Sequence, residues 1–152
     1  MSEGEDKGLW IRTILDQMAV AETPGMKEAV EACGRACVRS AEGFDAISAL
    51  RKKVGESASP EILFHAYKEE IYENRPNIWW KDGAVFLEYD RCACGMVTSG
   101  TVANPFLCHC TVGYSKEVFE TLFGHPVAVE LQGSILRGDS KCRQKITVVR
   151  ER

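Results

Sequence analysis

The chain has no cluster of basic residues and no long apolar run, and each absence argues against a class of protein. Its net charge is −3 at pH 7, and its most basic stretch is Arg51 to Lys53. Proteins that bind nucleic acid by neutralising phosphates need a basic face, so we expect no nucleic-acid partner. A membrane span needs about 20 apolar residues. No stretch of the sequence approaches that length, so we expect no membrane segment.

The amino-terminal segment, residues 1–7, is acidic and polar. A secretory leader instead begins with basic residues and continues with an apolar run. We therefore expect a cytoplasmic protein, in which cysteines remain thiols or metal thiolates. The seven cysteines are an odd number, which also argues against a framework of paired disulfides.

With 152 residues and 45% hydrophobic composition, the chain can bury one core, which predicts a single domain over residues 1–152. Residues 1–75 have the apolar spacing of helices, and residues 76–152 change to the pattern of strands. Thr23-Pro24 and Ser59-Pro60 predict helix starts, because each pairs a capping side chain with proline at the first helical position.

In the second half, Asp82-Gly83 predicts a tight hairpin turn between two strands. The other expected elements are a loop over 92–104, an extended segment at 108–110, a helix over 114–123, and strands over 127–132 and 142–149. The predicted fold class is α+β, with N-terminal helices followed by an antiparallel sheet that contains one inserted helix. The helices would cover one face of the sheet. An exposed sheet edge often pairs with a second copy, so we expect a homodimer.

Five of the seven cysteines lie within 51 residues of the second half. A tetrahedral zinc ion takes four ligands of this kind. The candidate zinc ligands are Cys108 and Cys142, followed by Cys94 and Cys110. In an extended segment the two side chains of Cys-x-Cys are about 6.5–7 Å apart, so the chain would have to bend around one ion. The alternatives are burial as small apolar side chains and a reactive thiol.

The second half is also rich in aromatic side chains. Trp80, Phe86, Tyr114 and Phe119 are the candidates for the wall of a pocket that binds a small apolar or aromatic molecule. The alternative is that these rings belong to an ordinary core.

Three segments resemble a known family: residues 106–114, 122–130 and 136–143. They contain a cysteine before a Gly-Tyr pair that opens a helix, then a Gly-His-Pro-Val turn, then a Gly-Asp-x-x-Cys hairpin. This order resembles the 4-vinyl reductase (hydrocarbon-binding) domain family. Cys33-Gly-Arg-Ala-Cys37 resembles a cysteine-rich bacterial branch near that family, which is also similar to aminothiazoline-carboxylate hydrolases.

The resemblance implies an α+β domain that binds a small molecule, in some members with a structural zinc beneath a pocket for aromatic ligands. Cys108 and Cys142 match two zinc-ligand positions of the family, whereas Leu131 and Ser134 occupy the other two. Cys110, Cys94 or Cys92 would have to replace the missing ligands. The leading hypothesis is a sensor-like or carrier-like domain with an aromatic pocket and a cysteine-bound zinc. The alternative is a hydrolase of a small cyclic amide or thiazoline that uses a cysteine or a zinc-activated water.

Overall fold

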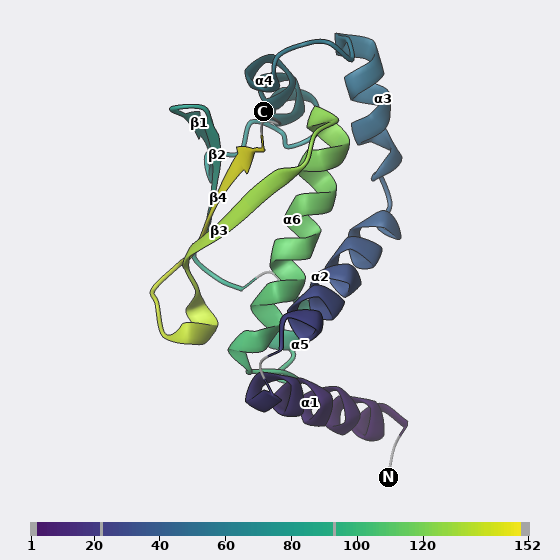
Figure 1. Cartoon of the computed structure of the whole chain (residues 1–152), viewed down its shortest axis with the longest axis vertical. Helices are drawn as coiled ribbons and strands as arrows, with labels where there is room; N and C mark the ends of the chain where they lie inside the picture. The colour runs from purple at the N-terminus through teal and green to yellow at the C-terminus, as the bar shows by residue number, and fades with distance from the viewer. Residues whose placement is uncertain (1–2, 22, 93, 150–152) are drawn as a thin grey trace.

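Four helices precede a four-stranded antiparallel sheet, and a long helix is inserted between its strands (Figure 1). The computed structural model describes residues 3–21, 23–92 and 94–149. Its helices are α1 (Glu3–Ala21), α2 (Pro24–Arg39), α3 (Asp45–Val54), α4 (Pro60–Glu70), α5 (Gly95–Thr98) and α6 (Cys108–Phe123), with 3-10 turns η1 (Pro105–Leu107) and η2 (Ile135–Arg137). Its strands are β1 (Ile78–Lys81), β2 (Ala84–Tyr89), β3 (Val127–Gly133) and β4 (Cys142–Val148).

Both helix starts expected from capping residue and proline are confirmed. Helix α2 begins at Pro24, directly after Thr23 in extended conformation. Helix α4 begins at Pro60, and the Ser59 hydroxyl accepts a hydrogen bond of 3.3 Å from the backbone N–H of Ile62. This bond satisfies one of the N–H groups that a helix start leaves without a partner.

The strands form one sheet in the order β1-β2-β4-β3, with all neighbours antiparallel. Strands β1 and β2 are joined at Asp82 and Gly83, whose φ angles are 50° and 77°. Two positive φ angles in succession are typical of the type I′ turn that fits the twist of a hairpin. The hairpin prediction is therefore confirmed.

Helices cover one face of this sheet. In β3, the side chains of Val127, Val129 and Leu131 are buried or half-buried, whereas those of Ala128 and Glu130 are exposed. Alternate residues of a strand point to opposite faces, so the apolar set of β3 marks the covered face. Helix α6 packs on β3 and α4 on β1, while α2 and α3 pack against α6 (Figure 1). The predicted α+β class, with helices before the sheet and one helix inserted in it, is confirmed.

Helix α2 lies unusually close to α6. A Cβ atom added at Gly34 of α2 would overlap the backbone carbonyl of Cys110, and one added at Gly113 of α6 would overlap the backbone of Glu31. Each helix therefore has a glycine where the other helix passes. Farther along the contact, Arg35 donates to Glu117 at 2.9 Å and Lys116 donates to Glu31 at 3.0 Å.

Two expectations for residues 92–110 were wrong. The segment expected to be a loop contains the short helix α5, and Cys108 and Cys110 lie in the first turn of α6 rather than in an extended segment. Asn104 accepts a hydrogen bond of 2.9 Å from the N–H of Phe106, and Pro105 opens the turn that runs into α6. Capping residue and proline therefore mark this helix start as well.

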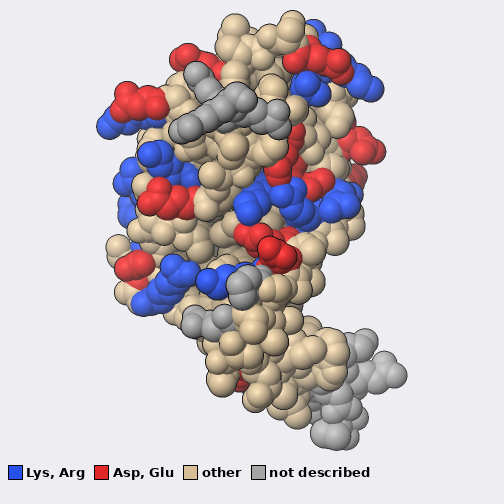
Figure 2. Space-filling model, in the orientation of Figure 1, with Lys and Arg blue, Asp and Glu red and all other residues tan. Residues whose placement is uncertain are grey.

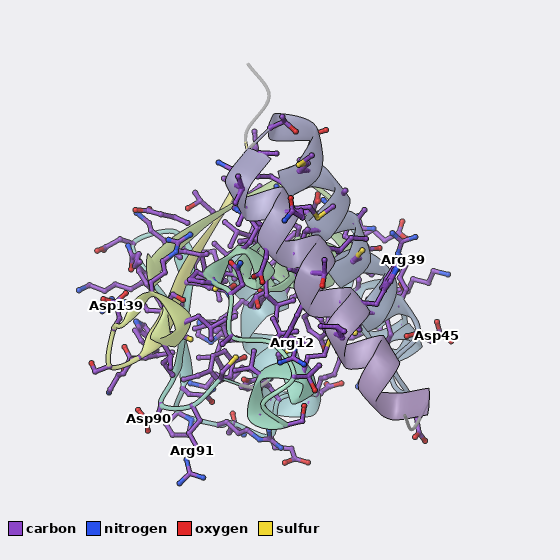
Figure 3. All side chains as sticks on the ribbon, turned by 90° about the horizontal axis from the view of Figure 1, so that it is seen from below. Arg12, Arg39, Asp45, Asp90, Arg91 and Asp139 are labelled. Carbon is purple, nitrogen blue, oxygen red and sulfur yellow. The ribbon has the colours of Figure 1, made fainter. Side chains whose placement is uncertain are left out.

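Charges of both signs are interleaved on the face of the protein seen in Figure 2. Seen from below in Figure 3, α1 lies across the end of the other helices, and Asp90 and Arg91 point away from the body. Helix α1 buries Leu15, but Leu9 and Trp10 remain exposed on its outer side. Within the residues described, no helix combines the length and the apolar composition needed to cross a membrane.

Candidate ligand pocket

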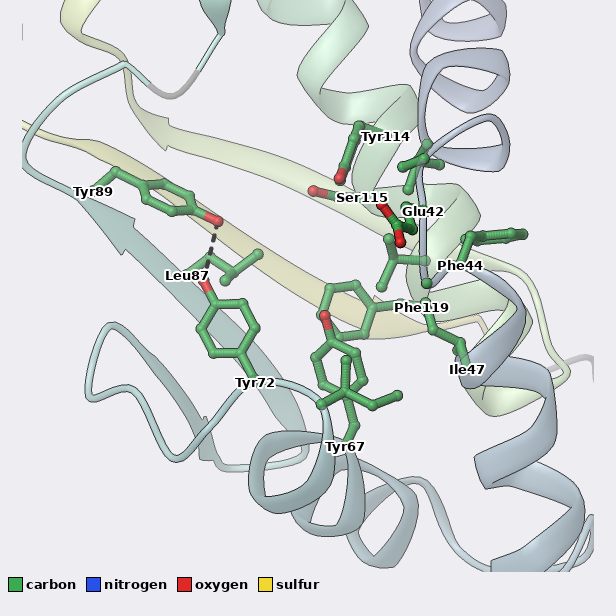
Figure 4. A pocket seen from close by; sticks show the side chains of 15 residues that line it. Glu42, Phe44, Ile47, Tyr67, Tyr72, Leu87, Tyr89, Tyr114, Ser115 and Phe119 are labelled. Carbon is green, nitrogen blue, oxygen red and sulfur yellow. Dashed lines mark hydrogen bonds between the residues drawn. The ribbon is translucent and has the colours of Figure 1, made fainter.

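A cavity of about 240 Å³ lies among α2, α3, α4, β2 and α6, open to solvent on one side (Figure 4). Ligand pockets for drug-sized molecules usually measure about 300–1,000 Å³. This cavity is therefore suited to a small molecule with a single aromatic ring. Its aromatic wall consists of Phe44, Tyr67, Tyr72, Tyr89, Tyr114 and Phe119.

All four tyrosines of the chain line this pocket. On α6, Ser115 and Phe119 lie on one face, because residues four apart along a helix are neighbours on its surface, and Tyr114 and Val118 line the pocket beside them. Leu87 and Tyr89 alternate with Glu88 in β2 and so point to the covered side of the sheet. Tyr67 lies in α4, and Tyr72 follows the end of that helix. The tertiary fold brings three separate segments together here.

Hydrogen bonds hold part of the wall in place. The side-chain amide of Asn77 donates to the Tyr72 hydroxyl at 3.1 Å, and the hydroxyls of Tyr72 and Tyr89 are 3.4 Å apart (Figure 4). Deeper in the protein, the buried hydroxyl of Ser115 donates to the side-chain carbonyl of Gln144 at 2.5 Å. This last pair holds the side chain of Ser115, which lines the pocket, because a buried polar side chain is costly unless it is paired.

The hydroxyls of Tyr67, Tyr89 and Tyr114 remain protonated at neutral pH. Burial raises the pKa of Tyr67, and burial followed by the hydrogen bond to Tyr72 raises the pKa of Tyr89. Burial also raises the pKa of Tyr114. A neutral tyrosine hydroxyl can donate or accept a hydrogen bond, so the largely apolar wall of the pocket also offers polar groups to a ligand.

Two of the four aromatic residues expected to form a pocket, Tyr114 and Phe119, line this one. The other two lie elsewhere. Trp80 packs against Phe64 with ring centroids 5.8 Å apart and lines a broad hollow on another side of the protein. Phe86 lies on the uncovered face of the sheet, stacked on Trp79 at 5.7 Å. Adjacent strand residues point to opposite faces, which separates Phe86 from Leu87 and the pocket.

The sequence did not single out Tyr67, Tyr72 and Tyr89, which line the pocket together with Tyr114. The chain has only four tyrosines, and their positions follow no periodic pattern that would mark a shared pocket.

Four cysteines line a second, much smaller cavity of about 30 Å³: Cys92, Cys94, Cys108 and Cys142. Its volume is close to the share of one water molecule in the liquid. The sulfur of Cys108 is 3.1 Å from the hydroxyl of Ser134, and the N–H of Ile135 donates to the sulfur of Cys142 at 3.4 Å. Gln144 lines this cavity too, so its bond to Ser115 joins the walls of the two cavities.

Cys110, the fourth expected zinc ligand, does not line the cysteine cavity. Residues two apart on a helix point in different directions, so the helical start of α6 turns Cys110 away from Cys108. Burial, with smaller effects of Cys94 and two cysteines of α2, raises the pKa of Cys110 to about 11. At neutral pH its thiol is protonated, which disfavours it as a nucleophile.

In the parts of the chain that the structure describes, no three His, Cys, Asp or Glu side chains are arranged to hold a metal ion. The thiols at the cavity nevertheless lie near one another. Burial raises the pKa of Cys92, and the neighbouring thiols of Cys142 and Cys94 raise it further. The donor type fits zinc, which prefers thiolates in structural sites. The four side chains line one cavity without surrounding a single point at ligand distance.

Comparison with solved structures identifies similar folds. The phenol-responsive sensory domain of the transcription activator PoxR, solved with phenol, has a TM-score of 0.50 and 16% identity, over 93% of this chain and 74% of that one. A trafficking protein particle complex subunit 3 from Naegleria fowleri, covalently bound to palmitic acid, has a TM-score of 0.48 and 13% identity, over 97% and 98% of the two chains. At 16% identity, the likeness to the PoxR domain concerns the fold alone, and it agrees with the predicted α+β class.

No curated protein matches the chain. One family model does, and it spans residues 1–152; its description is "Family of unknown function (DUF6144)". Membership in the 4-vinyl reductase family itself remains a prediction. Because the matching model covers the whole sequence, the chain belongs to the DUF6144 family.

Proposed function

We propose that the protein binds a small, ring-sized organic molecule in the tyrosine pocket, as a sensor-like or carrier-like domain. The observation that carries this proposal is the convergence of all four tyrosines on one cavity of about 240 Å³. A ring in this cavity would contact aromatic side chains on several sides. It would also meet neutral hydroxyl groups that can fix its orientation.

The fold supports the proposal. The PoxR sensory domain, whose structure contains phenol, shares the overall arrangement. A long acyl chain is a poorer candidate here, because the cavity is smaller than most pockets for drug-sized ligands.

The proposal predicts that phenol and p-cresol bind to the purified protein and that palmitate binds more weakly. Isothermal titration calorimetry would measure the affinities. Replacing Tyr114 with alanine should weaken phenol binding about tenfold, because it removes one ring of the wall, a loss of about 1.4 kcal/mol. Tyr114 is 41% exposed, so this change should leave the fold intact.

Ile62→Ala is the matched control. Ile62 is 56% exposed on α4 and does not line the pocket, so its removal should not change the affinity. The proposal is wrong if no single-ring compound binds, or if both variants weaken binding equally.

We also propose that the cysteine cavity binds zinc. The specific observation is that Cys108 and Cys142 line the same cavity as Cys94, joined by Cys92. Cys92 replaces Cys110 in the proposed ligand set, since Cys110 does not line the cavity. Zinc would draw the segment 92–94 and the β3–β4 hairpin closer together and join them to the start of α6. Its role would be structural, because four protein ligands leave no open position.

The zinc proposal predicts about one zinc ion per chain in protein purified without chelators, measured by elemental analysis. Cys142→Ser should abolish the bound zinc, whereas Cys33→Ser, at an exposed position of α2, should retain it. Cys110→Ser distinguishes the two ligand sets and should also retain the metal. Protein that contains no metal, and whose seven thiols all react in the native state, would exclude a zinc site.

A further inference from the structure

The tyrosine pocket has one charged side chain, and it is acidic. Among the residues described, Glu42 is the only charged group in the wall, and no Lys, Arg or His lines the cavity. In Figure 4, Glu42 lies on the same side of the pocket as Tyr114 and Ser115. The pocket also lies at the carboxyl end of α2, through Val38 and Ala41. The end of a helix carries a partial negative charge there.

The aromatic rings of the pocket also favour a positively charged ligand. The face of a tyrosine or phenylalanine ring is electron-rich and attracts a cation within about 6 Å of its centroid. One of these rings already does so: the guanidinium of Arg75, which does not line the cavity, is 5.6 Å from the centre of the Tyr72 ring. Several such faces around one cavity form the kind of cage that binds organic ammonium groups.

Two hydroxyl oxygens add to this environment. Among the residues described, the hydroxyls of Tyr67 and Tyr114 have no hydrogen-bond partner, although both side chains line the cavity. Each can therefore turn a lone pair toward a bound N–H group.

A negative charge would be poorly accommodated at the same place. Among the residues described, a ligand carboxylate would find no basic side chain in the lining to pair with it. The amino end of α3 also reaches the pocket through Phe44, but Asp45 in its first turn supplies a carboxylate close to that positive end.

We infer that the ligand class of the tyrosine pocket is a small organic ammonium ion, held between aromatic faces with Glu42 at the rim. This inference rests on the proposed function, because it specifies the ligand for the same pocket. It also implies that anionic aromatic compounds are excluded.

Three single-ring probes test the inference: benzylammonium, benzyl alcohol and benzoate. They are of similar size and differ mainly in charge, so calorimetric titration at neutral pH and one fixed ionic strength isolates its effect. We expect benzylammonium to bind at least about tenfold more tightly than benzyl alcohol. Benzoate should bind at least about tenfold more weakly than benzyl alcohol.

Two variants locate the charge effect. Glu42→Gln should reduce the preference for the cation over the alcohol several-fold, because it removes the only carboxylate of the wall. Glu28→Gln, an exposed acidic position of α2 outside the pocket, should leave that preference unchanged. Equal losses in the two variants would point to general surface charge and overturn the role of Glu42.

The outcomes separate this inference from the proposed function. If benzyl alcohol binds as tightly as the cation, or more tightly, the ammonium preference is wrong while small-molecule binding stands. If none of the three probes and no phenol binds, both are wrong. A cation preference that Glu42→Gln reduces and Glu28→Gln does not would support the inference.

Discussion

Replacing Gly34 with alanine is expected to destabilise the protein by about 3 kcal/mol, the upper end of the usual cost of overpacking a core. The new methyl group would overlap the backbone carbonyl of Cys110 in α6. A backbone carbonyl cannot move aside as the end of a flexible side chain can. The two helices would therefore have to separate along their contact. Gly113→Ala should have a similar effect, because its methyl group would overlap the backbone of Glu31 in α2.

Gly25→Ala is the matched control in the same helix. A Cβ atom at Gly25 has no other heavy atom within 4 Å. Alanine is also the better helix former, so this change should leave stability unchanged or raise it by up to about 1 kcal/mol. Urea unfolding followed by circular dichroism would measure all three variants. If Gly34→Ala and Gly25→Ala had the same stability, the close packing of α2 on α6 would be refuted.

Phe119→Ala is expected to lower the free energy of unfolding by about 3–5 kcal/mol, the usual cost of removing a buried phenylalanine ring. Phe119 is 2% exposed and lies where the core meets the pocket. Its ring centroid is 5.8 Å from those of Tyr67 and Phe123. The deletion would leave a void continuous with the pocket, and the neighbouring rings would lose contacts that they cannot replace.

Trp10→Ala is the control for Phe119→Ala. It removes a larger aromatic side chain, but one that is 66% exposed on α1, so the change should stay within about 0.5 kcal/mol. Denaturant unfolding of both variants gives the comparison. A loss below about 1 kcal/mol for Phe119→Ala would mean that the wall between core and pocket is loosely packed.

The predictions for the glycine crossing and for Phe119 both concern the position of α6. The crossing with α2 at Gly113 fixes the depth at which α6 lies, and Tyr114 and Phe119 then face the pocket from the same helix. A change that separates α2 from α6 would therefore also disturb the pocket wall. Gly34 and Gly113 do not line the pocket, but the helix contact that they allow places the pocket wall.

Local signals in the sequence were sufficient for most of the fold. Thr23-Pro24, Ser59-Pro60 and Asp82-Gly83 each act within a few residues, so their effect does not depend on distant packing. The start of α6 carried the same kind of signal in Asn104-Pro105, which was overlooked. A short apolar run such as 108–110 suits a strand and a buried helix alike, so its pattern alone does not decide between the predicted extended segment and the observed helix.

Which residues share a cavity does not follow from the sequence, because it depends on which faces of the elements meet. Phe86 and Leu87 are adjacent in the sequence, yet the sheet sends Leu87 to the pocket and Phe86 to the uncovered face. Cys108 and Cys110 were treated as a pair, but the helix separates them. Tyr67 and Tyr89 are 22 positions apart, and only the packing of α4 near β2 brings both to one cavity.

The sequence by itself determined the helix starts, the hairpin, the α+β class and the lack of a cluster of basic residues, since each depends on neighbouring residues or on composition. The tertiary structure alone decided that four tyrosines share one cavity with a single carboxylate, and that four cysteines line another. The physical reason is that a pocket is formed by side chains from separate elements. Their meeting depends on how closely the elements pack, as at Gly34 and Gly113, and no local pattern records it.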